Sequence, residues 1–143
     1  MSRIAIIALL ASFTVVASAQ LAAGPARVST AVLLGLVDHK TMPLYPDEAM
    51  KKGIHGDAIF EIDVDETGKI TASKPLAGDP LLLAVSKAAL QTFSFHPYLL
   101  NGSAVKVRSQ LGFHFSVEKN ANGINGHVEC MTSIPNRPEQ SPE

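Results

Sequence analysis

The chain has 143 residues, of which 46% are hydrophobic and 17% are charged, and its formal net charge is −1. This length allows one ordinary domain with short appendages and excludes the large barrel scaffolds of many enzymes, which need roughly 200 residues or more. The near-neutral charge argues against nucleic-acid binding, for which a strongly basic domain is expected. The single cysteine, Cys130, excludes an intramolecular disulfide and a multi-cysteine metal site.

The N-terminus has the parts of a secretory signal. Arg3 provides a positive charge, residues 4–17 form an unbroken apolar run, and Ala17-Ser18-Ala19 is a small-x-small cleavage site. We therefore expect a signal peptide over residues 1–19, with Gln20 as the mature N-terminus and no membrane span in the mature chain. The alternative is an uncleaved segment that anchors the protein in the membrane.

The first element expected after the signal is a short helix over residues 46–52. Pro46 suits the first helical turn, acidic residues follow it, lysines occupy the last turn, and Gly53 is placed to end the helix. The preceding N-terminal extension, residues 20–42, contains an apolar run at 28–37 without a clear period. That run fits a buried strand and a packed helical turn equally well.

A hairpin and a second helix follow. Residues 56–64 alternate between apolar and polar side chains, which predicts a half-buried strand. The residues of the next segment, 65–68, are typical of a turn, and 69–74 return as the second strand. Asp79-Pro80 then predicts the start of a helix whose apolar residues, at spacings of three and four, form one packed face.

The longest alternating stretch is 105–117, which follows a tight turn at Asn101-Gly102. The order helix, hairpin, helix, strand predicts an α+β fold: a small antiparallel β-sheet with two helices packed on one face. Four aromatic residues are expected to be buried together: Phe60, Phe93, Phe113 and Phe115.

The last segment, residues 118–143, changes in composition. It is rich in Asn, Gly, Pro, Ser and Glu and has no periodicity, so we expect a disordered polar tail that contains Cys130. The folded domain is therefore predicted to span residues 43–117.

Over residues 43–117 the ordered series of motifs resembles the TonB C-terminal domain family. The residues that carry the resemblance, before a final Phe113-x-Phe115, are Tyr45, Pro46, Gly53, Gly56, Gly68, Pro97, Asn101 and Gly102. The resemblance implies a bacterial, periplasmic domain that captures a short segment of an outer-membrane transporter by pairing it with its sheet. TonB proper also has a membrane helix that stays embedded and a long Pro-rich linker. A cleavable signal over residues 1–19 and the short extension 20–42 depart from that pattern, which puts energy transduction in doubt.

The leading prediction is a non-enzymatic binding module of the cell envelope, linked to transmembrane transport. An extended peptide of an envelope protein would be added to the strand 105–117 as an extra strand. The outward side chains of that strand are the partner-binding candidates: Lys106, Arg108, Gln110 and His114. The alternative for these four residues is a solvated face. Two other functions stay open, a self-associating envelope scaffold such as a homodimer and a small periplasmic hydrolase.

No motif predicts a catalytic residue, a metal site or a cofactor. The five histidines do not pair at helical spacing, and no H-E-x-x-H occurs. Asp63-x-Asp65-x-x-Gly68 resembles the start of a calcium loop, but Lys74 stands where the loop needs its last glutamate. Ser116-x-x-Lys119 has the spacing of serine acyl-enzymes but ends a predicted strand instead of opening a helix.

Overall fold

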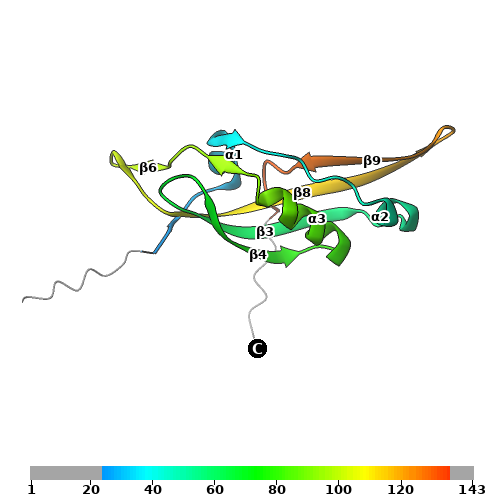
Figure 1. The fold of residues 1–143 in the computed structure, drawn as a ribbon, viewed down its shortest axis with the longest axis horizontal. Helices are drawn as coiled ribbons and strands as arrows, with labels where there is room; N and C mark the ends of the chain where they lie inside the picture. The colour runs from blue at the N-terminus through cyan, green and yellow to red at the C-terminus, as the bar shows by residue number, and fades with distance from the viewer. Residues whose placement is uncertain (1–23, 136–143) are drawn as a thin grey trace, which may run out of the picture.

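The structure is a computed structural model that describes residues 24–135, and its centre is one five-stranded sheet (Figure 1). The strand order is β1-β8-β3-β4, and β9 pairs with the part of β8 that β1 does not reach. All pairings in this sheet are antiparallel except that of β1 with β8. The strands of the sheet are β1 Ala26–Arg27, β3 Gly56–Val64, β4 Ile70–Ala77, β8 Val107–Asn120 and β9 Gly123–Cys130.

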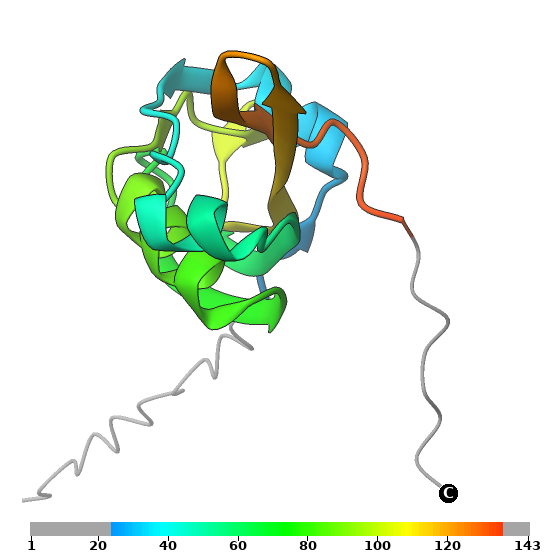
Figure 2. The ribbon, with the colours of Figure 1, turned by 90° about the vertical axis from the view of Figure 1, so that its right-hand side faces the viewer.

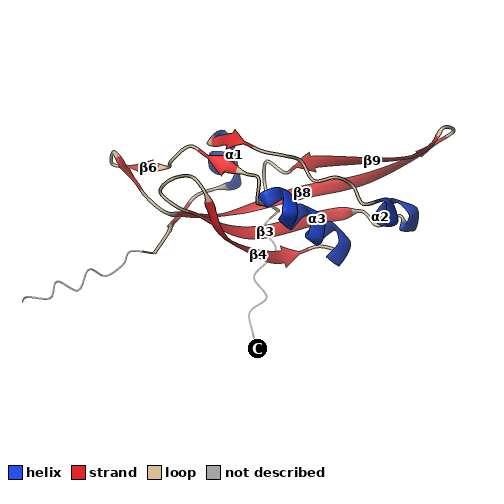
Figure 3. Cartoon of the chain, viewed as in Figure 1, coloured by secondary structure: helices blue, strands red, loops and turns tan. Residues whose placement is uncertain are grey.

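Three helices and two short strand pairs complete the described chain (Figure 3). The helices are α1 Thr30–Gly35, α2 Asp47–Lys52 and α3 Pro80–Leu90. The strand pairs are β2 Val37–His39 with β5 Ser94–Phe95, and β6 Leu99–Leu100 with β7 Ser103–Ala104. Viewed from the end of the molecule, α2 and α3 lie together on one side of the curved sheet (Figure 2). The predicted α+β fold is confirmed.

Helix α3 begins at Pro80 and α2 ends at Lys52, as the sequence indicated, whereas Pro46 precedes α2 as its N-cap instead of lying in its first turn. The carboxylate of Asp79 accepts a hydrogen bond from the Leu81 N–H, and Pro80 occupies the first turn of α3. In α2, acidic residues occupy the first turn and lysines the last, and Gly53 ends the helix in the left-handed region at φ 67°. Ala49 faces inward from α2 and is fully buried.

The β3–β4 hairpin depends on the glycine in its turn. Gly68 has φ 87°, a conformation that L side chains rarely adopt. A Cβ on Gly68 would lie 1.7 Å from the carbonyl oxygen of Phe95, because the turn runs against β5 and the Phe95 N–H donates to the Gly68 carbonyl. This position therefore excludes every side chain.

The core lies between the sheet and the helices, and the four predicted aromatic residues are buried in it. Phe113 and Phe115 are fully buried, Phe60 is 1% exposed and Phe93 is 4% exposed. The rings of Phe93 and Phe113 meet edge to face with centroids 5.9 Å apart. That geometry is the favoured one for aromatic pairs and adds to the free energy of burial.

Residues 28–37, for which the sequence left two possibilities open, form α1 and then enter β2. Ser29 caps α1 by accepting the Val32 N–H, and Leu33 is fully buried in the core. This packing resolves the ambiguity, because one turn of helix is enough to bring Leu33 inward.

The prediction of a disordered tail is wrong for residues 118–130, which form the end of β8, a turn and β9. Strand β8 continues to Asn120, and β9 returns along it with eight residue pairs. A turn at 120–123 joins them, with Gly123 at φ 132°. The two-stranded ribbon formed by the end of β8 and by β9 carries polar side chains on most of its surface. The sequence therefore shows no alternation of apolar and polar residues there. Cys130 accordingly lies in a strand opposite Phe113.

Three other predictions concern residues outside the described part of the chain. These are the signal peptide over 1–19, cleavage before Gln20, and disorder at 136–143.

Truncating Phe113 tests the core directly. Phe113→Ala is expected to lower the free energy of unfolding by about 3–5 kcal/mol, since a fully buried phenylalanine is replaced by a cavity. Urea unfolding followed by circular dichroism measures this loss. An unchanged unfolding midpoint would show that the faces of β8 are assigned the wrong way round.

Candidate binding edges of the sheet

Strand β8, which the sequence proposed as an open edge, is an internal strand. On one side it pairs with β3 over nine residue pairs. On the other side it pairs with β1 at Val107 and Arg108 and with β9 from Phe113 onward. The prediction that this strand accepts a peptide at a free edge is therefore wrong for the structure as it stands.

The gap between β1 and β9 is also closed. Thr30 Oγ1 donates to the Gln110 carbonyl at 2.9 Å, and the Met131 N–H donates to the Gly112 carbonyl at 2.8 Å. Upstream, the Ala26 N–H donates to the carbonyl of Lys106, directly before β8, and the Val28 N–H donates to that of Arg108. Backbone acceptors that face away from β3 are therefore satisfied from Lys106 to Gly112 by segments before and after the predicted domain.

Three of the four candidate residues lie in β8 with their side chains on the sheet face opposite the core, whereas Lys106 precedes the strand. Gln110, His114 and Lys106 are exposed, and Arg108 is half-buried. His114 Nδ1 lies 2.6 Å from a carboxylate oxygen of Asp57, directly across the β3–β8 pair. The structure thus brings Arg108, Gln110 and His114 onto one face. Their role in binding a partner stays a prediction.

Arg108 is engaged by β3 carboxylates. Its guanidinium donates two hydrogen bonds to Asp63, at 2.6 and 2.8 Å, and lies 4.0 Å from Glu61. The bidentate hydrogen bond from Arg108 lowers the pKa of Asp63, and the same pair raises the pKa of Arg108. This side chain therefore fixes the β3–β8 pair and is less available to a partner than Gln110.

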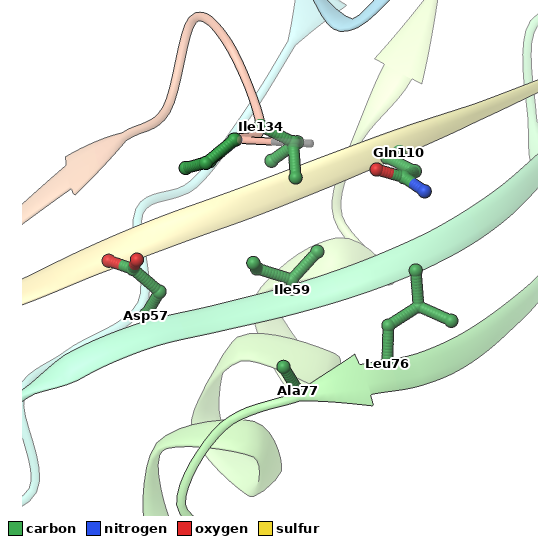
Figure 4. A pocket seen from close by; sticks show the side chains of 7 residues that line it. Asp57, Ile59, Leu76, Ala77, Gln110 and Ile134 are labelled. Carbon is green, nitrogen blue, oxygen red and sulfur yellow. The ribbon is translucent and has the colours of Figure 1, made fainter. Parts of the chain in front are cut away.

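The same face carries a hollow of about 550 Å³, which lies between strands β3, β4 and β8 and the segment after β9 (Figure 4). Its floor is apolar, and Asp57 and Gln110 contribute polar groups. The residues that line it are Asp57, Ile59, Leu76, Ala77, Gln110, Ile134 and Pro135. Only one of these side chains, Asp57, is titratable, so the hollow has the chemistry of a contact surface and lacks converging catalytic groups.

Within its bounds β4 pairs only with β3, so it is an edge strand of the sheet; directly before it, Lys69 forms an isolated antiparallel bridge with Ser94, which closes that end of the edge. Backbone groups alternate in direction along antiparallel strands. The carbonyls of the even-numbered residues from Lys106 to Gly112 point away from β3, so the backbone groups of the odd-numbered residues of β8 bond to β3. The same alternation of backbone groups, followed through the register of β3, decides which residues of β4 bond to β3. Lys74 then bonds to β3 opposite Glu61, whereas Ser73 and Pro75 present their backbone outward.

Pro75 is compatible with this placement. A proline lacks the N–H group and is tolerated in a sheet where that group would face outward. Together with exposed Lys74 and a register shift beside Phe60, it discourages pairing along the second half of β4. The part of the edge that can still accept a strand is therefore Ile70–Ser73.

A groove of about 540 Å³ runs beside this part of the edge. One wall is β4 and the other is the end of α3 with the segment that leads into β5. Apolar and hydroxyl side chains line it, and Lys69 stands at one end. The lining residues are Lys69, Ile70, Thr71, Ala72, Ser73, Leu90, Gln91, Thr92, Phe93 and Ser94.

The residues of the sequence motif have structural roles. Tyr45 packs edge to face on Phe115 with centroids 5.3 Å apart, and its hydroxyl donates to the Ile54 carbonyl. Burial raises the pKa of the Tyr45 hydroxyl. Asn101 and Gly102 both have positive φ, as the tight β6–β7 turn requires. Conformation and packing therefore explain these motif positions without a partner.

Three of the five histidines each lie beside one carboxylate, and His55 Nδ1 lies 2.8 Å from the Gly53 carbonyl instead. Besides His114, His96 lies 3.6 Å from Asp38 and His127 lies 3.0 Å from Glu129. Within residues 24–135 no group of three His, Cys, Asp or Glu side chains is placed to hold a metal ion. Burial raises the pKa of the Cys130 thiol, which keeps it protonated and unreactive at neutral pH.

Sequence reasoning missed Ser73, the groove along β4 and the cover that β1 places on β8. The proline at position 75 was an available signal for an edge strand. A two-residue strand such as β1 leaves no periodic signal at all.

No helix in the described range is long and apolar enough to span a membrane.

The Asp63–Arg108 pair predicts an acid-dependent contribution to stability. Because its pKa is lowered in the folded chain, Asp63 contributes stability above the ordinary aspartate pKa of about 4 and loses it as the pH falls through the folded value. Asp63→Asn should therefore be less stable than the wild type at pH 7, and the deficit should shrink in acid. Urea unfolding between pH 7 and about pH 2.5 measures it.

Glu61→Gln is the matched control, because Glu61 lies 4.0 Å from Arg108 without a hydrogen bond to it. We expect a smaller deficit for this variant at neutral pH. A deficit of Asp63→Asn that is the same at every pH would rule out the ion pair as its cause.

Comparisons with known proteins agree with the resemblance in the sequence. The family described as Gram-negative bacterial TonB protein C-terminal matches residues 41–117. Protein TonB of Vibrio cholerae serotype O1 is 31% identical over 85 residues, which are 58% of this chain and 35% of that protein, so the chain spans about a third of its relative's length.

A solution NMR structure of the Pseudomonas aeruginosa TonB C-terminal domain aligns with a TM-score of 0.49 and 23% identity, covering 59% of this chain and 87% of that one. The family match extends over more than half of the 143 residues. The chain belongs to the TonB C-terminal domain family.

Proposed function

We propose that this protein is a non-enzymatic, periplasmic binding domain that captures an extended segment of an outer-membrane transporter by strand addition at β4. The observation that carries the proposal is the unpaired edge Ile70–Ser73 with its groove. Family membership supports a role in envelope transport. The location of the site comes from the strand order.

Strand addition needs backbone donors and acceptors that face out of the sheet. The alternation along β4 gives Ser73 this orientation, while its neighbours Ala72 and Lys74 face β3. On the far side of the groove, Leu90–Ser94 limits how far the added strand can lie from β4. An extended segment of four or five residues would therefore fit between the two walls, since a strand rises about 3.3 Å per residue.

The charges beside the edge indicate the chemistry of the partner. Lys69 and Lys74 flank the open stretch, and both are exposed. The hydroxyl-rich lining favours small and polar side chains on the groove-facing positions. We therefore expect a bound segment with small or polar residues and an acidic residue near one end.

A proline at position 73 tests the site. Ser73→Pro removes the outward N–H and leaves the β3–β4 ladder intact, so binding should weaken about ten-fold or more. The probe is a set of synthetic peptides that cover the periplasm-facing segments of outer-membrane transporters from the same organism. Fluorescence anisotropy with the labelled peptides measures the affinity.

Ser73→Ala is the matched control, because it removes the hydroxyl and keeps the backbone donor. Ser73 is half-buried, but the affinity of this variant should stay within about two-fold of the wild type, since the variant keeps the backbone N–H that strand addition uses. Circular dichroism checks that both variants fold. A folded Ser73→Pro that binds as well as the wild type would exclude β4 as the acceptor.

A further inference from the structure

We propose that residues 24–28 act as an autoinhibitory strand: β1 fills an acceptor site on β8 in cis, and its release opens a second site for an extended segment. The segment lies outside the region that matches the family, which begins at residue 41. It nonetheless pairs with β8, the central strand of the sheet, and runs parallel to it. This inference concerns β8 and does not depend on binding at β4.

The bonds that hold β1 are those of a bound peptide. The Ala26 N–H donates to the Lys106 carbonyl at 2.8 Å, and the Val28 N–H donates to the Arg108 carbonyl at 3.1 Å. In return, Ser109 Oγ donates to the Val28 carbonyl at 2.8 Å. Main-chain bonds with one side-chain hydroxyl are the usual contacts of strand addition.

Side chains of the segment also occupy distinct positions. Ala26 and Val28 pack against the core, while Arg27 points outward and lies 3.9 Å from a carboxylate oxygen of Glu61. An external segment that replaces β1 should therefore carry a small residue and, two positions later, a β-branched residue, and should run parallel to β8. The residue between them faces solvent, as Arg27 does.

The contact is small enough to be exchangeable. β1 has two paired residues, whereas β3 pairs with β8 over nine. Arg27 is 77% exposed in its side chain, so its ion pair with Glu61 adds little. Short terminal strands of this kind open far more easily than the core of a sheet.

Release of β1 has a defined boundary. Ser29 caps α1, and the next turn is fixed by Thr30, which is bonded to Gln110, and by fully buried Leu33. Residues 24–28 can therefore leave while α1 stays in place.

The test uses the whole chain and a peptide of its own residues 24–29, GPARVS, as the probe. Val28→Pro removes the N–H that bonds to Arg108, which should empty the site. In an NMR titration, the amides of residues 106–109 of this variant should shift at peptide concentrations at least ten-fold lower than in the wild type.

Arg27→Pro is the control, since the N–H of Arg27 lies between the two N–H groups that bond to β8 and points away from it. It should behave as the wild type. Equal titration of Val28→Pro and the wild type, or shifts at Ile70–Ser73 instead of 106–109, would overturn the proposal.

A measurement on the wild type decides the case even where Val28→Pro does not fold. The amides of Ala26 and Val28 should exchange with solvent at least a hundred-fold faster than those of Leu111 and Phe113, which face β3. Equal protection of the two sets would show that β1 is a permanent part of the sheet, and the proposal would fail.

Discussion

The backbone of β8 has to find hydrogen-bond partners on both of its sides, and the rest of the structure follows from how it does so. Its 14 residues form the longest strand of the described chain, and its inward side chains form the centre of the core. Such a strand with one bare side would expose a row of donors and acceptors beside buried aromatic rings. Three separate segments, β1, α1 and β9, meet this requirement.

This arrangement moves the candidate binding site from one edge of the sheet to the other. With β8 covered, the open edge within the family-matched region is β4, where Pro75 restricts the usable part to its first half. The cover on β8 is uneven, because β9 contributes eight residue pairs and β1 only two. Under the two proposals made above, the domain has one open site at β4 and one site at β8 that its own chain occupies.

Much of the fold could be predicted from the sequence because it rests on local signals. The alternation of Gly56–Val64 fixes which side chains face the helices, and Asp79-Pro80 fixes where α3 begins. Gly68 could be placed in a turn by its type alone. In each case a period or a cap residue within a few positions determines the local structure.

The binding edge could not be predicted in this way, because strand order is a property of distant pairings. The alternation of 105–117 gave the faces of β8 correctly but said nothing about its neighbours. β9 was missed because its exposed ribbon carries polar residues on both faces. One of its few fixed positions is Gly126, where a Cβ would lie 2.6 Å from the ring of Tyr45.

Hydrogen exchange of the His114 and Ser116 amides, compared with those of Phe113 and Phe115, tests the central claim that β8 is paired on both sides. His114 and Ser116 face β9, whereas Phe113 and Phe115 face β3. The structure predicts that all four amides exchange slowly in the intact chain. Rapid exchange at His114 and Ser116 beside slow exchange at Phe113 and Phe115 would show that β9 does not cover β8, and would restore β8 as the open edge of the sheet.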